Sequence, residues 1–128
     1  MDLARKVLWF YIAMSVVFGS IYLLAPELMT RPMGIEPVAP EGFTDLRATY
    51  GGFQLGMAGF LWWCLRDSAR YGVGLTAFAF LVAALATCRL VGLLLDGFTP
   101  TMAAAATFEA GLTAFTLFVR GRLGAEVA

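Results

Sequence analysis

The sequence predicts an all-α integral membrane protein, a four-transmembrane-helix antiparallel up-down bundle with both termini in the cytoplasm. Three observations predict it. Of the 128 residues, 60% are hydrophobic and only 14% are charged, too few to cover the surface of a soluble domain. Four largely apolar segments each approach the roughly 20 residues that a helix needs to cross a bilayer. Connections between them are mostly short, as in an antiparallel bundle, so residues 1–128 are expected to form a single membrane domain.

Composition also excludes several classes of function. The formal net charge is zero, which gives no electrostatic basis for binding nucleic acid. Histidine is absent, and with it bis-histidine haem, most zinc sites and every Ser-His or Cys-His catalytic arrangement. The two cysteines are too few for a disulfide scaffold. No metal and no cofactor are expected, and the composition favours a protein that is not a conventional enzyme.

The first predicted helix covers residues 4–25 and is followed by a proline-rich loop, residues 26–44. The apolar run of this helix is longer than that of a cleaved signal peptide, so we expect the helix to be retained. Four prolines in the loop exclude a long regular helix and favour extended or turn conformations, with room for one short helical turn. The loop is interpreted as a connector by default, or as a cap over one mouth of the bundle.

The remaining helices are predicted at residues 45–66, 70–95 and 100–120. Thr44 or Asp45 is the expected N-cap of the second helix. The third helix should stop at the Asp96-Gly97 pair, and Pro100 or Thr101 should start the fourth. A tight polar turn separates the second helix from the third.

The positive-inside rule orients these four helices. Basic residues near the helix ends fall on one side of the membrane, at Arg5, Lys6, Arg66, Arg70, Arg120 and Arg122. The other side carries fewer basic residues among several acidic ones, namely Arg31 and Arg47 with Glu27, Glu36, Glu41 and Asp96. Both termini are therefore predicted in the cytoplasm and the proline-rich loop outside it, with the chain in a bacterial inner (plasma) membrane.

Arg89 is the residue that this architecture must accommodate, because it lies inside the apolar run of the third helix. Placing an arginine there costs about 2.5–3.5 kcal/mol, so a partner is expected. At a rise of about 1.5 Å per residue, Arg89 lies about 10 Å below the outer end of its helix, and Glu109 and Gln54 each lie about 13 Å below that surface. All three fall in the outer half of the hydrocarbon core. We therefore predict a buried polar core centred on an Arg89–Glu109 ion pair.

Helical periodicity adds neighbours to this pair. Positions 47, 50 and 54 share one face of the second helix, and position 96 lies two turns from position 89. The first helix presents a stripe of residues at positions 11, 15, 19 and 22. The candidate ligand-binding set is Arg47, Tyr50, Gln54, Arg89, Asp96 and Glu109. Alternatively, the ion pair serves only to fix the register of the helices, and both interpretations stay open.

Glycines on the second helix predict close helix packing. Gly52, Gly56 and Gly59 recur at small-xxx-small spacing on the face opposite Gln54. Such a stripe allows two helix backbones to approach, either within the chain or between protomers of a homo-oligomer. Packing within the chain is the preferred interpretation.

Several runs of residues resemble a known family. They are 46–56 (LRATYGGFQLG), 88–92 (CRLVG), 95–97 (LDG) and Glu109. The chain resembles, over most of its length, the small bacterial four-span membrane proteins catalogued as domain of unknown function 4345. More loosely, its layout is similar to DoxX-like four-helix membrane proteins and to the Erg28-like scaffold proteins of sterol biosynthesis. The resemblance implies the four-helix architecture and a shared polar centre at Arg47, Gln54, Arg89 and Glu109, but no established reaction.

The leading functional hypothesis is a non-enzymatic protein that binds a membrane lipid or small amphiphile, or docks a membrane-protein partner, through the polar core. The arginines would meet an anionic head group, and Gln54 and Tyr50 would orient it. The second hypothesis is an intramembrane isomerase or proton-transfer enzyme with Glu109 as the candidate catalytic acid/base. The third is a purely structural subunit of a membrane assembly.

Overall fold

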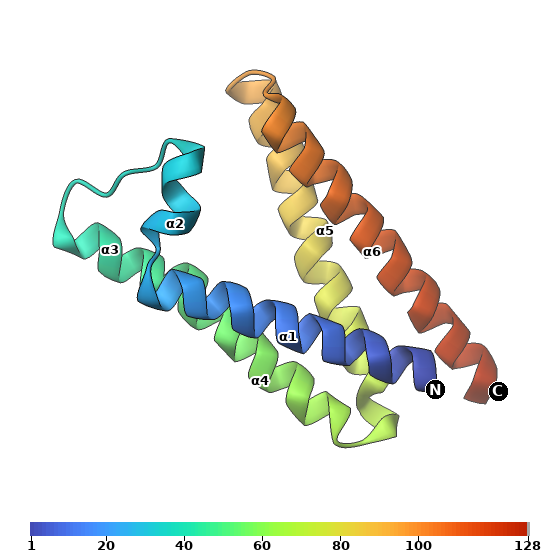
Figure 1. The fold of residues 1–128 in the computed structure, drawn as a ribbon. Coiled ribbons are helices and arrows are strands. Elements are labelled where there is room, and N and C mark those ends of the chain that lie inside the picture. The colour runs from blue at the N-terminus through green and yellow to red at the C-terminus, as the bar shows by residue number, and fades with distance from the viewer. Residues whose placement is uncertain (128) are drawn as a thin grey trace. The chain divides into compact units, whose positions relative to one another are not determined.

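The computed structural model describes the backbone of residues 1–127 and the side chains of residues 1–123 (Figure 1). All regular elements in this described part are helices, so the prediction of an all-α fold is confirmed. The chain divides into two compact units, Met1–Val7 with Asp67–Ala128, and Leu8–Arg66. We call the first the α5–α6 unit and the second the α1–α4 unit, and describe each by itself.

The α5–α6 unit is an antiparallel helical hairpin. Its helices are α5 (Tyr71–Leu95) and α6 (Pro100–Val127), preceded by the short 3-10 helix η3 (Ser68–Arg70). The turn between them contains Gly97 with a φ of +103°, a backbone conformation that glycine adopts without steric cost. Residue numbers rise along α5 as those of its contacts fall along α6: Gly72 faces Arg120 and Arg89 faces Glu109.

The α1–α4 unit pairs α1 (Asp2–Leu24) with a helical path from Pro40 to Leu65. That path consists of α3 (Pro40–Leu46), a π-helical stretch η2 (Arg47–Gly52) and α4 (Phe53–Leu65). The first residues of α1, up to Val7, belong to the other unit. The pairing is antiparallel, because the Trp9 ring meets that of Trp62 and the Tyr22 ring meets that of Tyr50.

The predicted polar and small stripe of the first helix lies on its buried face. Tyr11 and Ser15 are fully buried and Gly19 is also buried, while Tyr22 is half-buried. Gly19 is in close contact with the second helical path: a Cβ built on it would be 2.9 Å from Cγ of Leu55. The stripe, whose members are three or four residues apart, thus lies on the packed side of α1.

The segment predicted as a loop, residues 26–44, is more helical than expected. It contains α2 (Glu27–Thr30), the 3-10 helix η1 (Arg31–Met33) and the start of α3. Thr44 and Asp45 do not cap the second helix, so that prediction is wrong: α3 begins at Pro40 after the extended residue Ala39. The first turn of a helix tolerates proline because its N–H groups have no intrahelical partner, so here proline starts a helix instead of preventing one.

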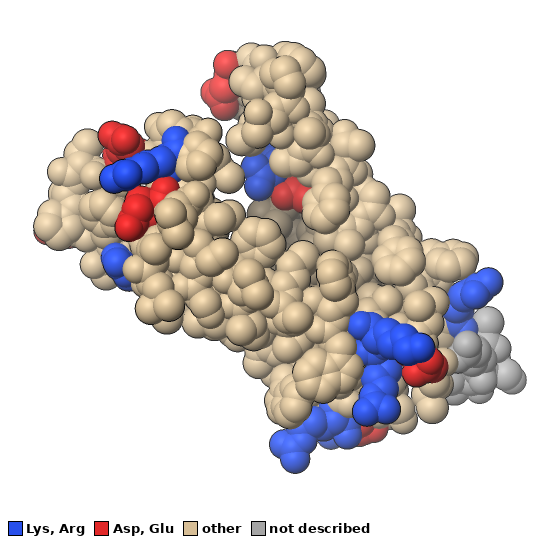
Figure 2. Space-filling model, viewed as in Figure 1, with Lys and Arg blue, Asp and Glu red and all other residues tan. Residues whose placement is uncertain are grey.

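Within the described part of the chain, three helices are long and apolar enough to cross a membrane: Asp2–Leu24, Ser68–Leu95 and Pro100–Leu123. The predicted second span is not among them, because the π-helical stretch leaves α4 only 13 residues. Large apolar side chains on the long helices are exposed, among them Phe80 at 74% and Leu94 at 85%. Figure 2 shows few charged side chains along the middle of the long helices. This pattern is typical of helices surrounded by lipid.

Candidate functional site

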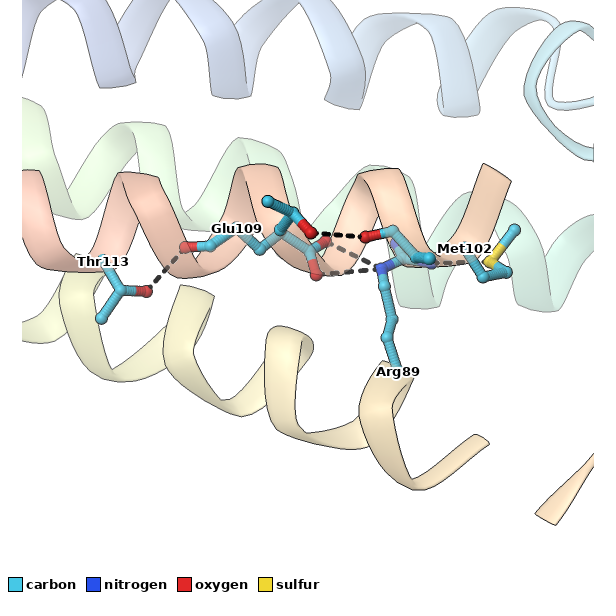
Figure 3. Close-up of polar contacts among 6 residues, drawn as sticks. Arg89, Met102, Glu109 and Thr113 are labelled. Carbon is cyan, nitrogen blue, oxygen red and sulfur yellow. Dashed lines mark hydrogen bonds and ion pairs between the residues drawn. The ribbon is translucent and has the colours of Figure 1, made fainter. Parts of the chain in front are cut away.

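The centre of the candidate site is the ion pair between Arg89 on α5 and Glu109 on α6 (Figure 3). Nε of Arg89 donates to both carboxylate oxygens of Glu109, at 2.9 Å to Oε1 and 3.0 Å to Oε2. The Arg89 side chain is 31% exposed and that of Glu109 13%. The predicted ion pair is therefore confirmed. Its attraction offsets the free-energy cost of placing a guanidinium in an apolar helix.

The hairpin itself sets the geometry of this pair. Arg89 lies seven residues before the end of its helix region at Asp96, and Glu109 nine residues after Pro100, so the turn brings them to similar heights. The backbone carbonyl of Glu109 accepts a hydrogen bond from Thr113 Oγ1 at 2.9 Å, one turn along α6. The pair is thus built from two rigid elements of one unit.

Met102 is a further contact of the guanidinium. Nη1 of Arg89 lies 3.4 Å from its sulfur, a weak acceptor (Figure 3). The sequence reasoning missed this residue, although Met102 lies two turns before Glu109 on the same face of α6. Nη2 of Arg89 makes no hydrogen bond among the described residues, so its N–H groups have no acceptor there.

Arg47 of the candidate set has a structural contact. Its Nε donates to the backbone carbonyl of Leu23 at 2.8 Å. Leu23 lies in the last turn of α1, where carbonyls lack intrahelical partners and Pro26 cannot donate an N–H. A guanidinium there satisfies an orphan carbonyl and complements the negative end of the helix dipole.

The remaining candidates have different surroundings. Tyr50 is 49% exposed and stacks on Tyr22, with ring centroids 5.0 Å apart and planes 19° apart. Gln54 is half-buried, and Asp96 is exposed at the end of α5. The structure thus joins Arg89 to Glu109 in the α5–α6 unit, whereas Arg47, Tyr50 and Gln54 belong to the α1–α4 unit. A single polar core containing all six residues stays a prediction.

The glycines that make close contacts are not those of the predicted stripe. Within the described residues, a Cβ on Gly56 or Gly59 would meet no heavy atom within 4 Å, and one on Gly52 would meet only its own helix. Gly51 is the close approach instead, since its Cβ would lie 3.2 Å from the backbone nitrogen of Leu23. Packing of α1 therefore uses Gly19 and Gly51, and a role of the predicted stripe between protomers stays a prediction.

Comparison with known proteins identifies the family. No curated protein and no solved structure matches the chain. One family model does match, over residues 3–119, and it therefore includes the first helix as well as the runs noted in the sequence. The chain belongs to the family described as domain of unknown function (DUF4345).

Proposed function

We propose that this chain is a four-span protein of a bacterial inner membrane, with both termini in the cytoplasm, whose Arg89–Glu109 pair binds the polar head group of a lipid or small amphiphile. The three long apolar helices support the membrane assignment. The 13 residues of α4 and the 6 of the π-helical stretch together reach the roughly 17–25 residues of a transmembrane helix. They supply the fourth span.

The positions of basic residues support the proposed orientation. In the α5–α6 unit, Arg70 precedes α5, whereas Arg120 and Arg122 lie in the last part of α6, so the antiparallel pairing puts all three at the end away from the Gly97 turn. Acidic Asp96 lies beside that turn. Positive charge is retained on the cytoplasmic side of membrane helices, so this distribution supports a cytoplasmic location for that end.

The observation that carries the binding proposal is that the nitrogens of the Arg89 guanidinium differ in their hydrogen-bond acceptors. Both oxygens of Glu109 accept from Nε, so the Nε end of the guanidinium is anchored by a charge-assisted hydrogen bond. Nη1 has only a thioether sulfur as acceptor, and Nη2 has no acceptor among the described residues. A guanidinium held in this way presents preorganised N–H donors to a phosphate or carboxylate oxygen.

Removing both members of the pair tests the proposal. In the Arg89→Leu/Glu109→Leu double variant no unpaired charge remains, so we expect it to insert and fold while losing the ligand. Native mass spectrometry of the purified full-length protein should detect a lipid or amphiphile on the wild type and at least about tenfold less on the variant, the loss of one charge-assisted contact.

The exposed ion pair of Asp2 and Lys6 provides a matched control. Its Asp2→Asn/Lys6→Gln variant removes two charges from an ion pair whose side chains are 75% and 72% exposed, so ligand retention should not change. A double variant at Arg89 and Glu109 that folds and retains as much ligand as the wild type would leave the pair as a structural element alone. No contact of the described residues favours the acid/base role of Glu109, which stays a prediction.

A further inference from the structure

An open pocket of the α1–α4 unit lies beside the proline-rich segment and is lined by charged side chains that have no ion-pair partner among the described residues. Its volume is about 660 Å³, within the range of roughly 300–1,000 Å³ that is usual for small-molecule sites. A smaller cavity of about 150 Å³ adjoins it and shares Glu27, Arg31, Pro37 and Phe43. We call the two together the cap pocket.

The charges of the cap pocket are balanced. Arg31 and Arg47 contribute two guanidinium groups, and Glu27 and Glu36 contribute two carboxylates. Glu27 and Arg31 are one helical turn apart, yet the structure records no ion pair between them or to any other described residue. Figure 2 shows acidic and basic side chains gathered over the region of α2 and α3. Cations and anions left unpaired in one cavity suit a ligand that itself carries both charges.

Thr30 is a second and independent sign of a ligand. The residue lines the smaller cavity and is only 2% exposed, but its hydroxyl has no hydrogen-bond partner among the described residues. Buried hydroxyls are almost always hydrogen-bonded, because an unsatisfied one loses its hydration without compensation. A ligand oxygen in the cap pocket would supply the missing partner.

We propose that the cap pocket binds an aminoalkyl phosphate, either as a free small molecule or as the head group of a lipid. The phosphate oxygens would accept from Arg31 and from those N–H groups of Arg47 that do not cap α1. The amine would donate to Glu27, and Thr30 would donate to a phosphate oxygen. Phe43 and Pro37 provide an apolar wall beside these groups. The proposal concerns residues of the α1–α4 unit alone and does not depend on the Arg89–Glu109 pair.

Isothermal titration calorimetry on the full-length protein in detergent tests this assignment. The probes are phosphoethanolamine, dihexanoyl phosphatidylethanolamine and inorganic phosphate. We expect saturable binding of at least one of the two amine-containing probes, with inorganic phosphate at least about tenfold weaker because it lacks the contact to Glu27. Binding of the free head group identifies a soluble ligand as sufficient, and binding of the short-chain lipid alone identifies a lipid. Inorganic phosphate binding as tightly as both other probes would overturn the assignment.

Three substitutions locate the site. Arg31→Gln and Glu27→Gln should each weaken binding about tenfold, whereas Arg66→Gln and Glu41→Gln, which alter exposed charges of the same unit outside the cavity, should leave it unchanged. Thr30→Val should fold, raise the Tm without ligand because it removes the unsatisfied hydroxyl, and weaken binding. Absence of saturable binding, or binding that none of the three substitutions affects, would refute the proposal. The Arg89→Leu/Glu109→Leu variant should still bind, so failure of one proposal leaves the other standing.

Discussion

The α5–α6 unit and the α1–α4 unit are both antiparallel helical hairpins, but different interactions join their helices. A partly buried ion pair links α5 to α6, whereas glycines and aromatic rings bring α1 against the path from Pro40 to Leu65. Apolar side chains gain little from contacting each other instead of lipid, so membrane helices associate through close packing or through polar contacts. The α5–α6 hairpin uses a polar contact, and the α1–α4 hairpin uses close packing.

The largest expected effect comes from removing only one partner of the ion pair between α5 and α6. Arg89→Leu leaves the Glu109 carboxylate, 13% exposed, without its partner, and should lower the free energy of unfolding by about 3–5 kcal/mol. The Arg89→Leu/Glu109→Leu double variant should recover most of that loss. Unfolding of the purified protein in mixed micelles measures both. Equal stability of the single variant and the wild type would mean that the pair contributes nothing to the α5–α6 hairpin.

The close packing of α1 should be disturbed by an alanine at position 51 and not by one at position 56. Gly51→Ala puts a methyl group 3.2 Å from the Leu23 backbone nitrogen and 3.3 Å from the Gly19 carbonyl oxygen, and backbone cannot move aside as a side chain can. We expect a loss of about 1–3 kcal/mol. Gly56→Ala has open space within the described residues, so helix propensity should make it neutral or stabilising by up to about 1 kcal/mol. The same unfolding measurement compares them, and equal effects would contradict the close packing of α1 against Gly51.

The aromatic contribution should be the smallest of the three. The rings of Trp9 and Trp62 meet edge to face, with centroids 5.2 Å apart. A double-mutant cycle with Trp9→Leu and Trp62→Leu should give a coupling energy of about 0.5–1.5 kcal/mol. A cycle that pairs Trp9→Leu with Phe53→Leu serves as the control, because these two rings are not in contact. Coupling as large in the control cycle would show that the effect does not come from the ring pair.

The ion pair could be predicted from the sequence because it lies within one hairpin. The Asp96-Gly97 turn and Pro100 fix where α5 ends and α6 begins, and the constant rise of an α-helix then gives the heights of Arg89 and Glu109. Residues on different hairpins do not share a turn from which their heights can be compared. Depth alone therefore could not establish whether Gln54 joins the pair.

What the sequence did not indicate lies between residues 26 and 52. Counting prolines predicted a loop, but Pro32 and Pro40 each occupy the first turn of a helix, where the missing N–H costs nothing. The contact between Arg47 and the Leu23 carbonyl depends on where α1 ends, and the cavity lined by Thr30 depends on how α2 folds back. Both features depend on tertiary structure, and no repeating pattern in the sequence predicts them.

The π-helical stretch from Arg47 to Gly52 has a consequence for every residue that follows it. An α-helix turns about 100° per residue, but hydrogen bonds spaced five residues apart widen the coil and reduce that angle. Side chains of α4 are therefore out of phase with those of α3, and one helical wheel cannot represent both. Deleting one residue inside the stretch would let it rewind as an α-helix with α4 facing nearly the same way, because the stretch holds about one residue more than an α-helix needs for the same rotation. Rewinding all six residues without a deletion would instead rotate α4 by about 100° relative to α3. The stretch thus determines which way α4 faces.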